Sequence, residues 1–338
     1  MEIKLVRKFL KMKTLFIYGS TGDLVKRKVI PALQKLNIPV KILALGRKKL
    51  SSGDYKKIIC KENECPNSFK KNIIYRKNLL EEITCASCYN SLNRKEINFF
   101  YISLPPKMIK NALSQIGDIK KHGFKVKILI EKPFGENLSD AKKLKHFIWK
   151  NKLKKEIVLS DHYLFKKSIL SLKKKNFRKL KIVGLEKVGL EGRISYYDEA
   201  GALKDMIQSH FLNILFKISP NLKLNKVKII EVIKKQYKNY EKELGKKSDT
   251  ETYVKIKMLV KGKEIEFETG KNFEKKESYI VIDGKRLELD NENSYEKVFF
   301  DLLNKNWKNF PSINNSLEAW KITEKIEREM EKEDLLFY

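Results

Sequence analysis

The chain has 338 residues, enough for two domains or one large one, and the 42% of them that are hydrophobic can form a packed core. Its 73 Lys and Arg residues outnumber its 42 Asp and Glu residues, which gives a formal net charge of +31. The basic residues are mostly lysine, are spread over the whole chain and accompany no nucleic-acid-binding signature, so we favour a proteome-wide lysine bias over nucleic-acid binding as the reason for the charge. An anionic substrate would also benefit from the positive field.

The N-terminal segment 1–13 mixes apolar residues with Lys and Arg, and it lacks the uninterrupted apolar stretch of a secretory signal. No segment of the sequence reaches the length of about 18 apolar residues that a transmembrane helix needs. We therefore expect a cytoplasmic protein.

A glycine-containing turn lies between a predicted strand at 14–18 and a predicted helix at 24–36. Glycines at such a turn let the backbone approach a dinucleotide pyrophosphate, and the N-terminus of the following helix supplies free N–H groups. The predicted cofactor-binding residues of this turn are Gly19, Ser20, Thr21, Gly22, Asp23 and Leu24.

The second predicted strand, 40–45, ends at Gly46 and Arg47. NAD-specific folds carry an Asp or Glu at this point to bind the ribose hydroxyls, and none is present here. A cationic side chain suits the 2′-phosphate of NADP. We therefore predict NADP as the cofactor and Arg47 as a cofactor-binding residue; a solvated basic loop is the alternative.

Four cysteines lie near one another in the sequence. Two pairs of thiolates could hold a structural zinc. The first pair is more widely spaced than in a usual zinc knuckle, and a reducing cytosol keeps thiols free. We favour unliganded cysteines, with a zinc site and a disulfide left open. The four are Cys60, Cys65, Cys85 and Cys88.

Further buried strands are predicted at 98–104, 127–131 and 157–160, with helical stretches between them. This alternation is typical of a Rossmann-like, doubly wound parallel sheet, and we predict an α/β domain over 1–165.

After about residue 180 the pattern changes to β-prone segments, mostly alternating, with one long helical stretch at 202–218. A polar loop is predicted at 237–249, and two amphipathic helices at 294–305 and 316–332. We predict an α+β second domain over 166–338 with a largely antiparallel sheet. Its predicted strands are 179–185, 226–234, 251–260, 263–269 and 278–282.

Six segments follow one another in a recognisable order: GSTGDLVKRK at 19–28, FFYISLPP at 99–106, IEKPFG at 130–135, DHYLFK at 161–166, EGRISYYD at 191–198 and GALKDMIQSH at 201–210. Together they resemble the motifs of the glucose-6-phosphate dehydrogenase family. TETY at 250–253 is one of several fainter similarities. The resemblance implies oxidation of glucose 6-phosphate to 6-phosphogluconolactone with reduction of NADP, the first step of the oxidative pentose phosphate pathway.

The chain also departs from the family pattern. It is much shorter than usual for the family. Leu159 stands where an Arg is usual, Phe165 replaces a Gly, and Ser209 replaces an Asn. These changes concern substrate affinity and assembly more than the type of reaction, because no group needed for the chemistry is lost.

The reaction requires a base that takes the proton of the C1 hydroxyl. His210 is the best candidate, because an imidazole titrates near neutral pH. The resemblance implies that Asp161 orients the imidazole ring. No metal is expected.

The resemblance also implies a set of substrate-binding residues. His162, Tyr163 and Lys166 supply an imidazole, a phenol and an ammonium group, which suit a dianionic phosphate. Lys132 lies at the C-terminal end of a predicted strand and is implied to contact both sugar and cofactor. The remaining predicted substrate-binding residues are Glu186, Asp205, Lys271 and Lys276.

Two other functions stay open. One is another NADP-linked sugar or polyol dehydrogenase with a Glu-Lys-Pro motif, and the DHY and GALKDM segments argue against it. The other is a non-catalytic, basic relative that binds nucleic acid, and the retention of Asp161 and His210 argues against that. A homodimer is one open alternative for the assembly.

Overall fold

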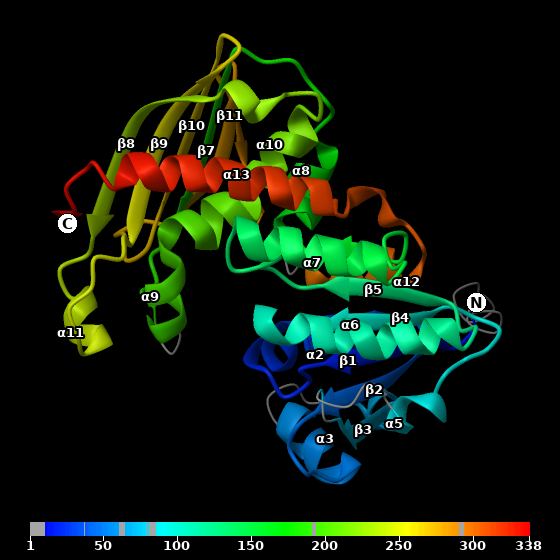
Figure 1. Ribbon diagram of the computed structural model, residues 1–338. Helices are drawn as coiled ribbons and strands as arrows, with labels where there is room; N and C mark the ends of the chain where they lie inside the picture. The colour runs from blue at the N-terminus through cyan, green and yellow to red at the C-terminus, as the bar shows by residue number, and fades with distance from the viewer. Residues whose placement is uncertain are drawn as a thin grey trace, which may run out of the picture. The chain divides into compact units, whose positions relative to one another are not determined.

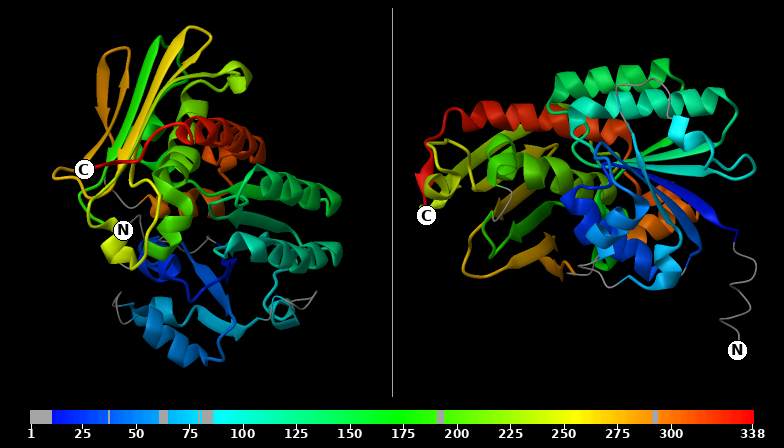
Figure 2. Two further views of the ribbon diagram at one scale, coloured as in Figure 1. Left: turned by 60° about the vertical axis from the view of Figure 1, so that its left-hand side comes forward. Right: turned by 90° about the horizontal axis from the view of Figure 1, so that it is seen from below.

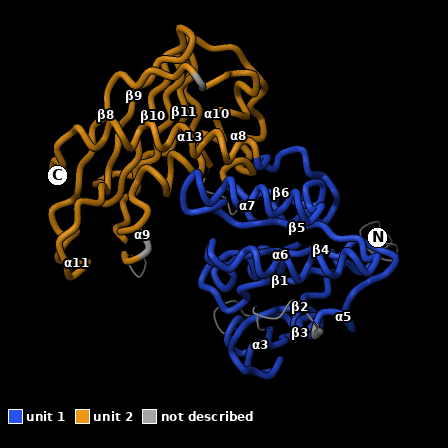
Figure 3. The backbone as a smooth tube through the Cα atoms, viewed as in Figure 1, with its two compact units in different colours: residues 1–162, 293–313 blue, residues 163–292, 314–338 orange. Residues whose placement is uncertain are grey.

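The computed structural model describes residues 11–36, 38–60, 65–78, 80, 86–190, 194–290 and 294–338. They belong to two compact units, shown in Figure 3. The first unit comprises residues 1–162 and 293–313, and the second comprises residues 163–292 and 314–338. A segment from the C-terminal part of the chain therefore belongs to the first unit.

The first unit is built on a six-stranded parallel sheet with the order β3-β2-β1-β4-β5-β6 (Figure 1). The strand order reverses between β1 and β4, which is where open α/β sheets bind their ligands. The central strands are continuous apolar runs because both faces of the sheet are covered. The strands are β1 (Lys13–Tyr18), β2 (Val40–Gly46), β3 (Ile73–Lys77), β4 (Asn98–Ile102), β5 (Val126–Ile130) and β6 (Ile157–Leu159).

Helices cover both faces of this sheet. Figure 2 shows α6 and α7, in cyan and green, on one face, and the blue α2 with the orange α12 on the other. Pro106 opens α6, a position where the missing N–H costs nothing, and the Asn137 side chain caps α7 by accepting from the Asp140 N–H at 2.9 Å. The helices and helical turns are η1 (Val25–Val29), α2 (Ile30–Lys35), α3 (Ser52–Cys60), α4 (Asn67–Lys70), α5 (Ala86–Tyr89), α6 (Pro106–Lys121), α7 (Leu138–Lys150), α12 (Tyr295–Leu303) and η5 (Trp307–Asn309).

The second unit is built on a seven-stranded sheet with the order β12-β11-β7-β10-β9-β8-β13. Its neighbours are antiparallel except for β7 with β10 and β8 with β13. The predicted combination of a parallel Rossmann-like sheet and a largely antiparallel second sheet is thus confirmed. The strands are β7 (Lys179–Leu185), β8 (Lys228–Gln236), β9 (Tyr253–Val260), β10 (Lys263–Gly270), β11 (Glu277–Ile282), β12 (Lys285–Glu288) and β13 (Leu336–Phe337).

The predicted helix at 202–218 is present as two consecutive helices, η3 and α10, and η3 packs on the sheet through Phe211 against Phe267. The prediction of a loop over 237–249 is wrong in part, because α11 lies within it. Tyr237 and Tyr240 are both buried, and the Tyr240 hydroxyl donates to Asp198 at 3.0 Å, so two aromatic residues anchor this otherwise polar segment. The helices and turns are η2 (His162–Phe165), α8 (Lys167–Ser171), α9 (Ile194–Ala202), η3 (Leu203–Phe211), α10 (Leu212–Ile218), η4 (Leu224–Lys226), α11 (Tyr240–Leu244) and α13 (Ile313–Met330).

The cysteines differ from the favoured prediction. Cys60 and Cys65 form a disulfide, and Cys88 is also disulfide-bonded, so the expectation of unliganded cysteines is wrong for these three. Among the described residues no group of potential metal ligands includes a cysteine. Cys85 lies outside the described residues, as do Glu191, Gly192 and Arg193 of the fifth motif.

In the part of the chain that the structure describes, no helix combines the length and the apolar character that membrane crossing requires.

Candidate active site

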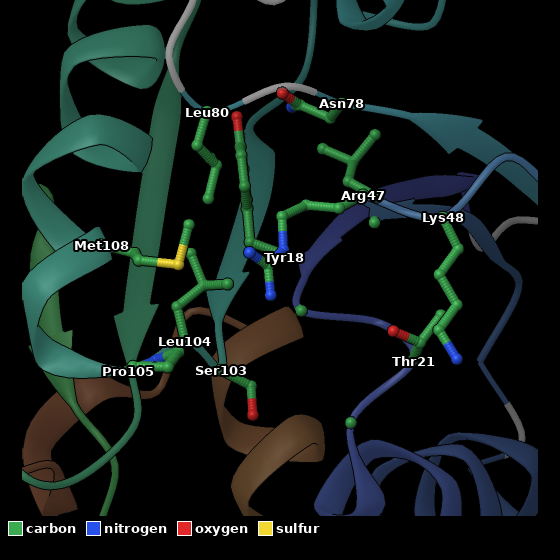
Figure 4. Close-up of a pocket in the computed structure, with 14 residues that line it drawn as sticks. Tyr18, Thr21, Arg47, Lys48, Asn78, Leu80, Ser103, Leu104, Pro105 and Met108 are labelled. Atoms are coloured by element: carbon green, nitrogen blue, oxygen red, sulfur yellow. The ribbon is translucent and has the colours of Figure 1, made fainter.

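A pocket lies at the C-terminal ends of β1, β2 and β4 in the first unit (Figure 4). Three of the predicted cofactor-binding residues of the glycine turn line it: Gly19, Thr21 and Gly22. The pocket therefore occupies the position at which a parallel sheet with this strand order binds a dinucleotide. Its other lining residues are Tyr18, Leu45, Gly46, Arg47, Lys48, Asn78, Leu80, Ser103, Leu104, Pro105 and Met108.

Gly19 is required by the geometry of the turn. Its φ is +77°, a conformation that favours glycine, and a Cβ there would lie 2.0 Å from the carbonyl oxygen of Ser103. The N–H of Gly22 donates to the carbonyl of Gly19 at 2.9 Å and closes the turn. The chain after β1 thus passes directly beside the end of β4, with no side chain between them.

The remaining predicted residues of the turn do not line the pocket. Ser20 is fully buried, and its carbonyl accepts a hydrogen bond from the Tyr55 hydroxyl at 3.0 Å. The Asp23 side chain accepts from Arg27 one helical turn later, and Leu24 immediately precedes η1. Ser20 therefore stabilises the turn through its backbone contact with Tyr55, and Asp23 and Leu24 lie at the start of the helix.

Two basic residues at the end of β2 line the pocket. Figure 4 shows the Arg47 side chain pointing into it and the Lys48 side chain extending toward Thr21. The Tyr75 hydroxyl donates to the Lys48 carbonyl at 2.7 Å and so holds the backbone directly after these two residues. The sequence places both residues in one basic run, from which only Arg47 was predicted as a cofactor-binding residue.

Lys132 follows β5 in the first unit, and the peptide bond that joins it to Pro133 is cis. The preceding residue, Glu131, is buried, and burial raises the pKa of its carboxyl group. One carboxyl oxygen accepts from Tyr101 and from Ser160, both at 2.8 Å, and the other accepts from the Lys132 N–H at 3.3 Å. Glu131 therefore ties the backbone of Lys132 to the neighbouring strands.

Asp161 and His162 follow β6 at the C-terminal edge of the same sheet. The His162 ring stacks on Tyr295 of α12 at a centroid distance of 5.3 Å. The pKa of Tyr295 is raised, first by burial and then by Glu131, and the Asp161 charge adds to the effect. Glu131 at the end of β5 and Asp161 at the end of β6 thus both act on the buried side chain of Tyr295. The sequence analysis did not identify Tyr295 as a site residue.

In the second unit, His210 lies near the C-terminal end of η3 and stacks on Tyr163. The ring centroids are 4.2 Å apart, and the ring planes differ by 27°. Stacking of this kind restricts the rotation of the imidazole. The structure therefore brings together a predicted base and a predicted phosphate ligand.

Lys166 also lies against Tyr163, with its ammonium nitrogen 5.1 Å from the ring centroid. The ammonium donates to the carbonyl of Asp290, which follows β12. Burial lowers the pKa of Lys166; Asp290 opposes this shift, and Lys276 adds to it. The charges of Lys166 and Lys276 therefore influence each other.

A second group in this unit has Lys271 at its centre. Its ammonium lies 2.6 Å from a Glu186 carboxyl oxygen and 3.4 Å from an Asp205 carboxyl oxygen. The same ammonium lies 5.8 Å from the centroid of the Tyr197 ring. Three predicted substrate-binding residues thus form one hydrogen-bonding group, which offers both donors and acceptors.

The sequence matches two family models. The model described as glucose-6-phosphate dehydrogenase, NAD binding domain, matches residues 16–170, and the one described as glucose-6-phosphate dehydrogenase, C-terminal domain, matches residues 167–230. The glucose-6-phosphate 1-dehydrogenase of Buchnera aphidicola subsp. Schizaphis graminum is 30% identical to this chain over 363 aligned positions, which cover 86% of this chain and 72% of that protein.

Solved structures share the fold. A glucose-6-phosphate dehydrogenase in complex with its substrate glucose-6-phosphate has a TM-score of 0.78 at 18% identity, and the match covers 96% of this chain and 94% of that chain. A 3-ketoreductase from Actinomadura kijaniata, solved with NADP and TDP-benzene, has a TM-score of 0.60 at 11% identity and covers 97% of this chain. The two family models and the 30% identical relative decide between these neighbours: the chain belongs to the glucose-6-phosphate dehydrogenase family.

Proposed function

We propose that this chain oxidises D-glucose 6-phosphate to 6-phospho-D-glucono-1,5-lactone and reduces NADP to NADPH. The observation that carries the proposal is the similarity to a glucose-6-phosphate 1-dehydrogenase over 86% of the chain. The sugar-dehydrogenase alternative shares the fold at much lower identity. The second unit contains two groups of polar residues, one around Lys166 and one around Lys271. The first offers a cation to the phosphate of a phosphorylated sugar, and the second offers donors and acceptors to its hydroxyl groups.

The residues around the glycine turn fit NADP. Gly19 allows the close approach of the turn to Ser103 that shapes this pocket, the following helix offers N–H groups to a pyrophosphate, and Arg47 supplies a cation for the 2′-phosphate. When bound, NADP accepts the hydride that leaves C1 of the sugar. Lys132, at the end of β5, is the residue proposed to contact both cofactor and sugar.

His210 is proposed as the general base that accepts the proton of the C1 hydroxyl. Its stacking on Tyr163 restricts the orientation of the ring plane, and one ring nitrogen is proposed to face the hydroxyl. Asp161 is proposed to orient the ring and to stabilise the imidazolium that forms. As the proton moves to His210, the C1–O bond gains double-bond character and the lactone results.

The 6-phosphate is proposed to bind His162, Tyr163 and Lys166, with Lys276 adding positive charge. Charge-assisted hydrogen bonds to a dianion are the strongest polar contacts that these side chains can make. The group formed by Glu186, Asp205 and Lys271 is proposed to bind the sugar hydroxyls, which need acceptors as well as donors.

The reaction is tested by following NADPH absorbance with glucose 6-phosphate, free glucose and inositol in parallel. We expect rapid reduction only with glucose 6-phosphate. Equal rates with free glucose or inositol would show that the sugar or polyol dehydrogenase alternative is right.

Arg47→Ala is expected to lower kcat/KM for NADP about tenfold and to leave kcat/KM for NAD unchanged, because only the contact with the 2′-phosphate is lost. Steady-state kinetics with both cofactors measure the ratio. The control is Lys49→Ala, because Lys49 is exposed, belongs to the same basic run and does not line the pocket. An unchanged cofactor ratio in Arg47→Ala would show that another group reads the 2′-phosphate.

Three further statements belong to this proposal and stay predictions from the sequence. They are an NADP domain at 1–165 with a substrate and assembly domain at 166–338, a cytoplasmic location, and a small-molecule substrate in place of nucleic acid. A homodimer remains one open alternative for the assembly.

A further inference from the structure

The TETY segment at 250–253 has no role in the proposed chemistry, yet one of its residues is bonded to the helix that carries His210. A carboxyl oxygen of Glu251 accepts a hydrogen bond from the Leu203 N–H at 2.9 Å. The backbone carbonyl of Glu251 accepts from the Ala202 N–H at 3.1 Å. Side chain and main chain of one residue therefore satisfy two N–H groups at the start of η3, which would otherwise lack partners inside the helix.

Gly201 shows that the chain is shaped around this carboxyl group. Its φ is +64° and its ψ is 177°, which breaks the helical geometry between α9 and η3. A Cβ at Gly201 would lie 2.4 Å from a carboxyl oxygen of Glu251. The carboxyl group occupies the space of the absent side chain, so the sharp break and the position of Glu251 depend on each other.

The other end of η3 carries the proposed base. His210 is seven residues after Leu203 on the same helix, stacked on Tyr163. The Ser209 hydroxyl donates to the Lys204 carbonyl at 2.8 Å, which bonds the two ends of the helix to each other. A displacement at the first turn of η3 is thus transmitted to the imidazole through a short, hydrogen-bonded segment.

We propose that Glu251 is a positioning residue for the general base, because it fixes the start of the helix that holds His210. The proposal rests on the proposed role of His210. The negative charge of an ionised carboxylate at a helix N-terminus is favourable, and a bond to a charged acceptor is stronger than one to a neutral acceptor. The ionised carboxylate of Glu251 therefore makes stronger hydrogen bonds to the start of η3 than the protonated group does, although burying its charge costs the fold more free energy than these bonds return.

Glu251 changes its charge near neutral pH. Burial raises the pKa of its carboxyl group to about 7; the Leu203 N–H and Lys204 oppose the shift, and Glu327 adds to it. Glu251 is buried, and it is one of the residues that line a pocket in this unit. The other titratable groups near Glu251 come from α9, α11 and the segment before β9, and they are Tyr197, Asp198, Glu199, Tyr240 and Asp249.

The kinetic test compares wild type with Glu251→Gln, which keeps a hydrogen-bond acceptor but cannot ionise. We expect kcat of wild type to exceed that of Glu251→Gln by about three- to tenfold at pH 8.5, and the two values to converge at pH 6, where Glu251 is protonated. Glu251→Ala, which has no acceptor, is expected to lose about tenfold or more at both pH values. The Kd for NADP should stay the same in all variants.

The control is Glu266→Gln. Glu266 is a carboxylate of the same unit that pairs with Lys181 and Lys255 on the sheet. Its kcat ratio to wild type should not vary with pH. A constant kcat ratio between wild type and Glu251→Gln from pH 6 to pH 8.5 would overturn the proposal, since a structural role alone would not produce the dependence on pH.

A second readout does not depend on catalysis. Because the folded-state pKa of Glu251 lies above its ordinary value of 4.5, wild type loses stability as the pH rises from about 4.5 to about 7, and the Gln variant does not. The Tm of Glu251→Gln relative to wild type should therefore be higher at pH 8 than at pH 5. If wild type fails to oxidise glucose 6-phosphate, the proposed function is wrong. If the Tm difference between Glu251→Gln and wild type is the same at pH 5 and at pH 8, the proposal for Glu251 is wrong, whatever the activity.

Discussion

His210→Ala is expected to lower kcat by about 10²–10⁴-fold, the range that loss of a general base produces. The reason is specific to one step: without the imidazole, the proton of the C1 hydroxyl has no positioned acceptor when hydride leaves. The measurement is steady-state and single-turnover NADPH formation with saturating glucose 6-phosphate.

Binding of NADP should survive this change, because the pocket at the glycine turn belongs to the first unit and His210 belongs to the second. His146→Ala removes an exposed imidazole from α7 and provides the matched control, with kcat expected to equal that of wild type. If His210→Ala retained more than about a tenth of the wild-type kcat, a different group would have to be the base.

The strands of the first unit could be predicted because most of them are buried on both faces. The segments 14–18, 40–45 and 98–104 are apolar runs, and the structure places strands in all three. β3 was missed for the opposite reason: it is an edge strand, and it ends in Arg76 and Lys77, both exposed. An edge strand has a neighbouring strand along one edge only, so more of its residues are exposed and its sequence is less continuously apolar than that of a central strand.

The same reasoning explains β12 and β13 in the second unit. Both lie at the edges of the seven-stranded sheet and are short, and β12 is largely charged. Their places are determined by pairing with β11 and β8, a long-range contact that local sequence patterns do not contain.

The candidate site was only partly readable from the sequence. Tyr163 and Lys166 are close in sequence, so one motif identified both. The residue that holds Lys166 is Asp290, 124 positions later, and the ring that stacks on His162 belongs to Tyr295. Contacts over such separations depend on the tertiary fold. Glu131 was inside a quoted motif, but its role as the acceptor for Tyr101 and Ser160 is visible only when three neighbouring strands are assembled.

Lys166→Ala is expected to lower kcat/KM for glucose 6-phosphate by about ten- to a hundredfold, because a hydrogen bond to a charged group contributes roughly 1.5–3 kcal/mol. The slow reaction with free glucose, which has no phosphate, should be nearly unchanged. The comparison of the two substrates in one variant therefore separates loss of phosphate binding from general damage. Lys174→Ala, an exposed lysine nearby in the sequence, is the control and should leave both reactions unchanged.

Two features of the surroundings shape this experiment. Lys166 donates to the Asp290 carbonyl and lies over the Tyr163 ring, so its removal also takes one contact away from each of these two groups. Lys167, the next residue, can supply an ammonium in its place, and the double variant Lys166→Ala with Lys167→Ala covers that case. A partial loss in the single variant and a larger loss in the double variant would assign the phosphate to this segment. If the double variant still prefers phosphorylated over free glucose as strongly as wild type does, the 6-phosphate binds elsewhere, and the proposed substrate loses the contact that most distinguishes it from an unphosphorylated sugar.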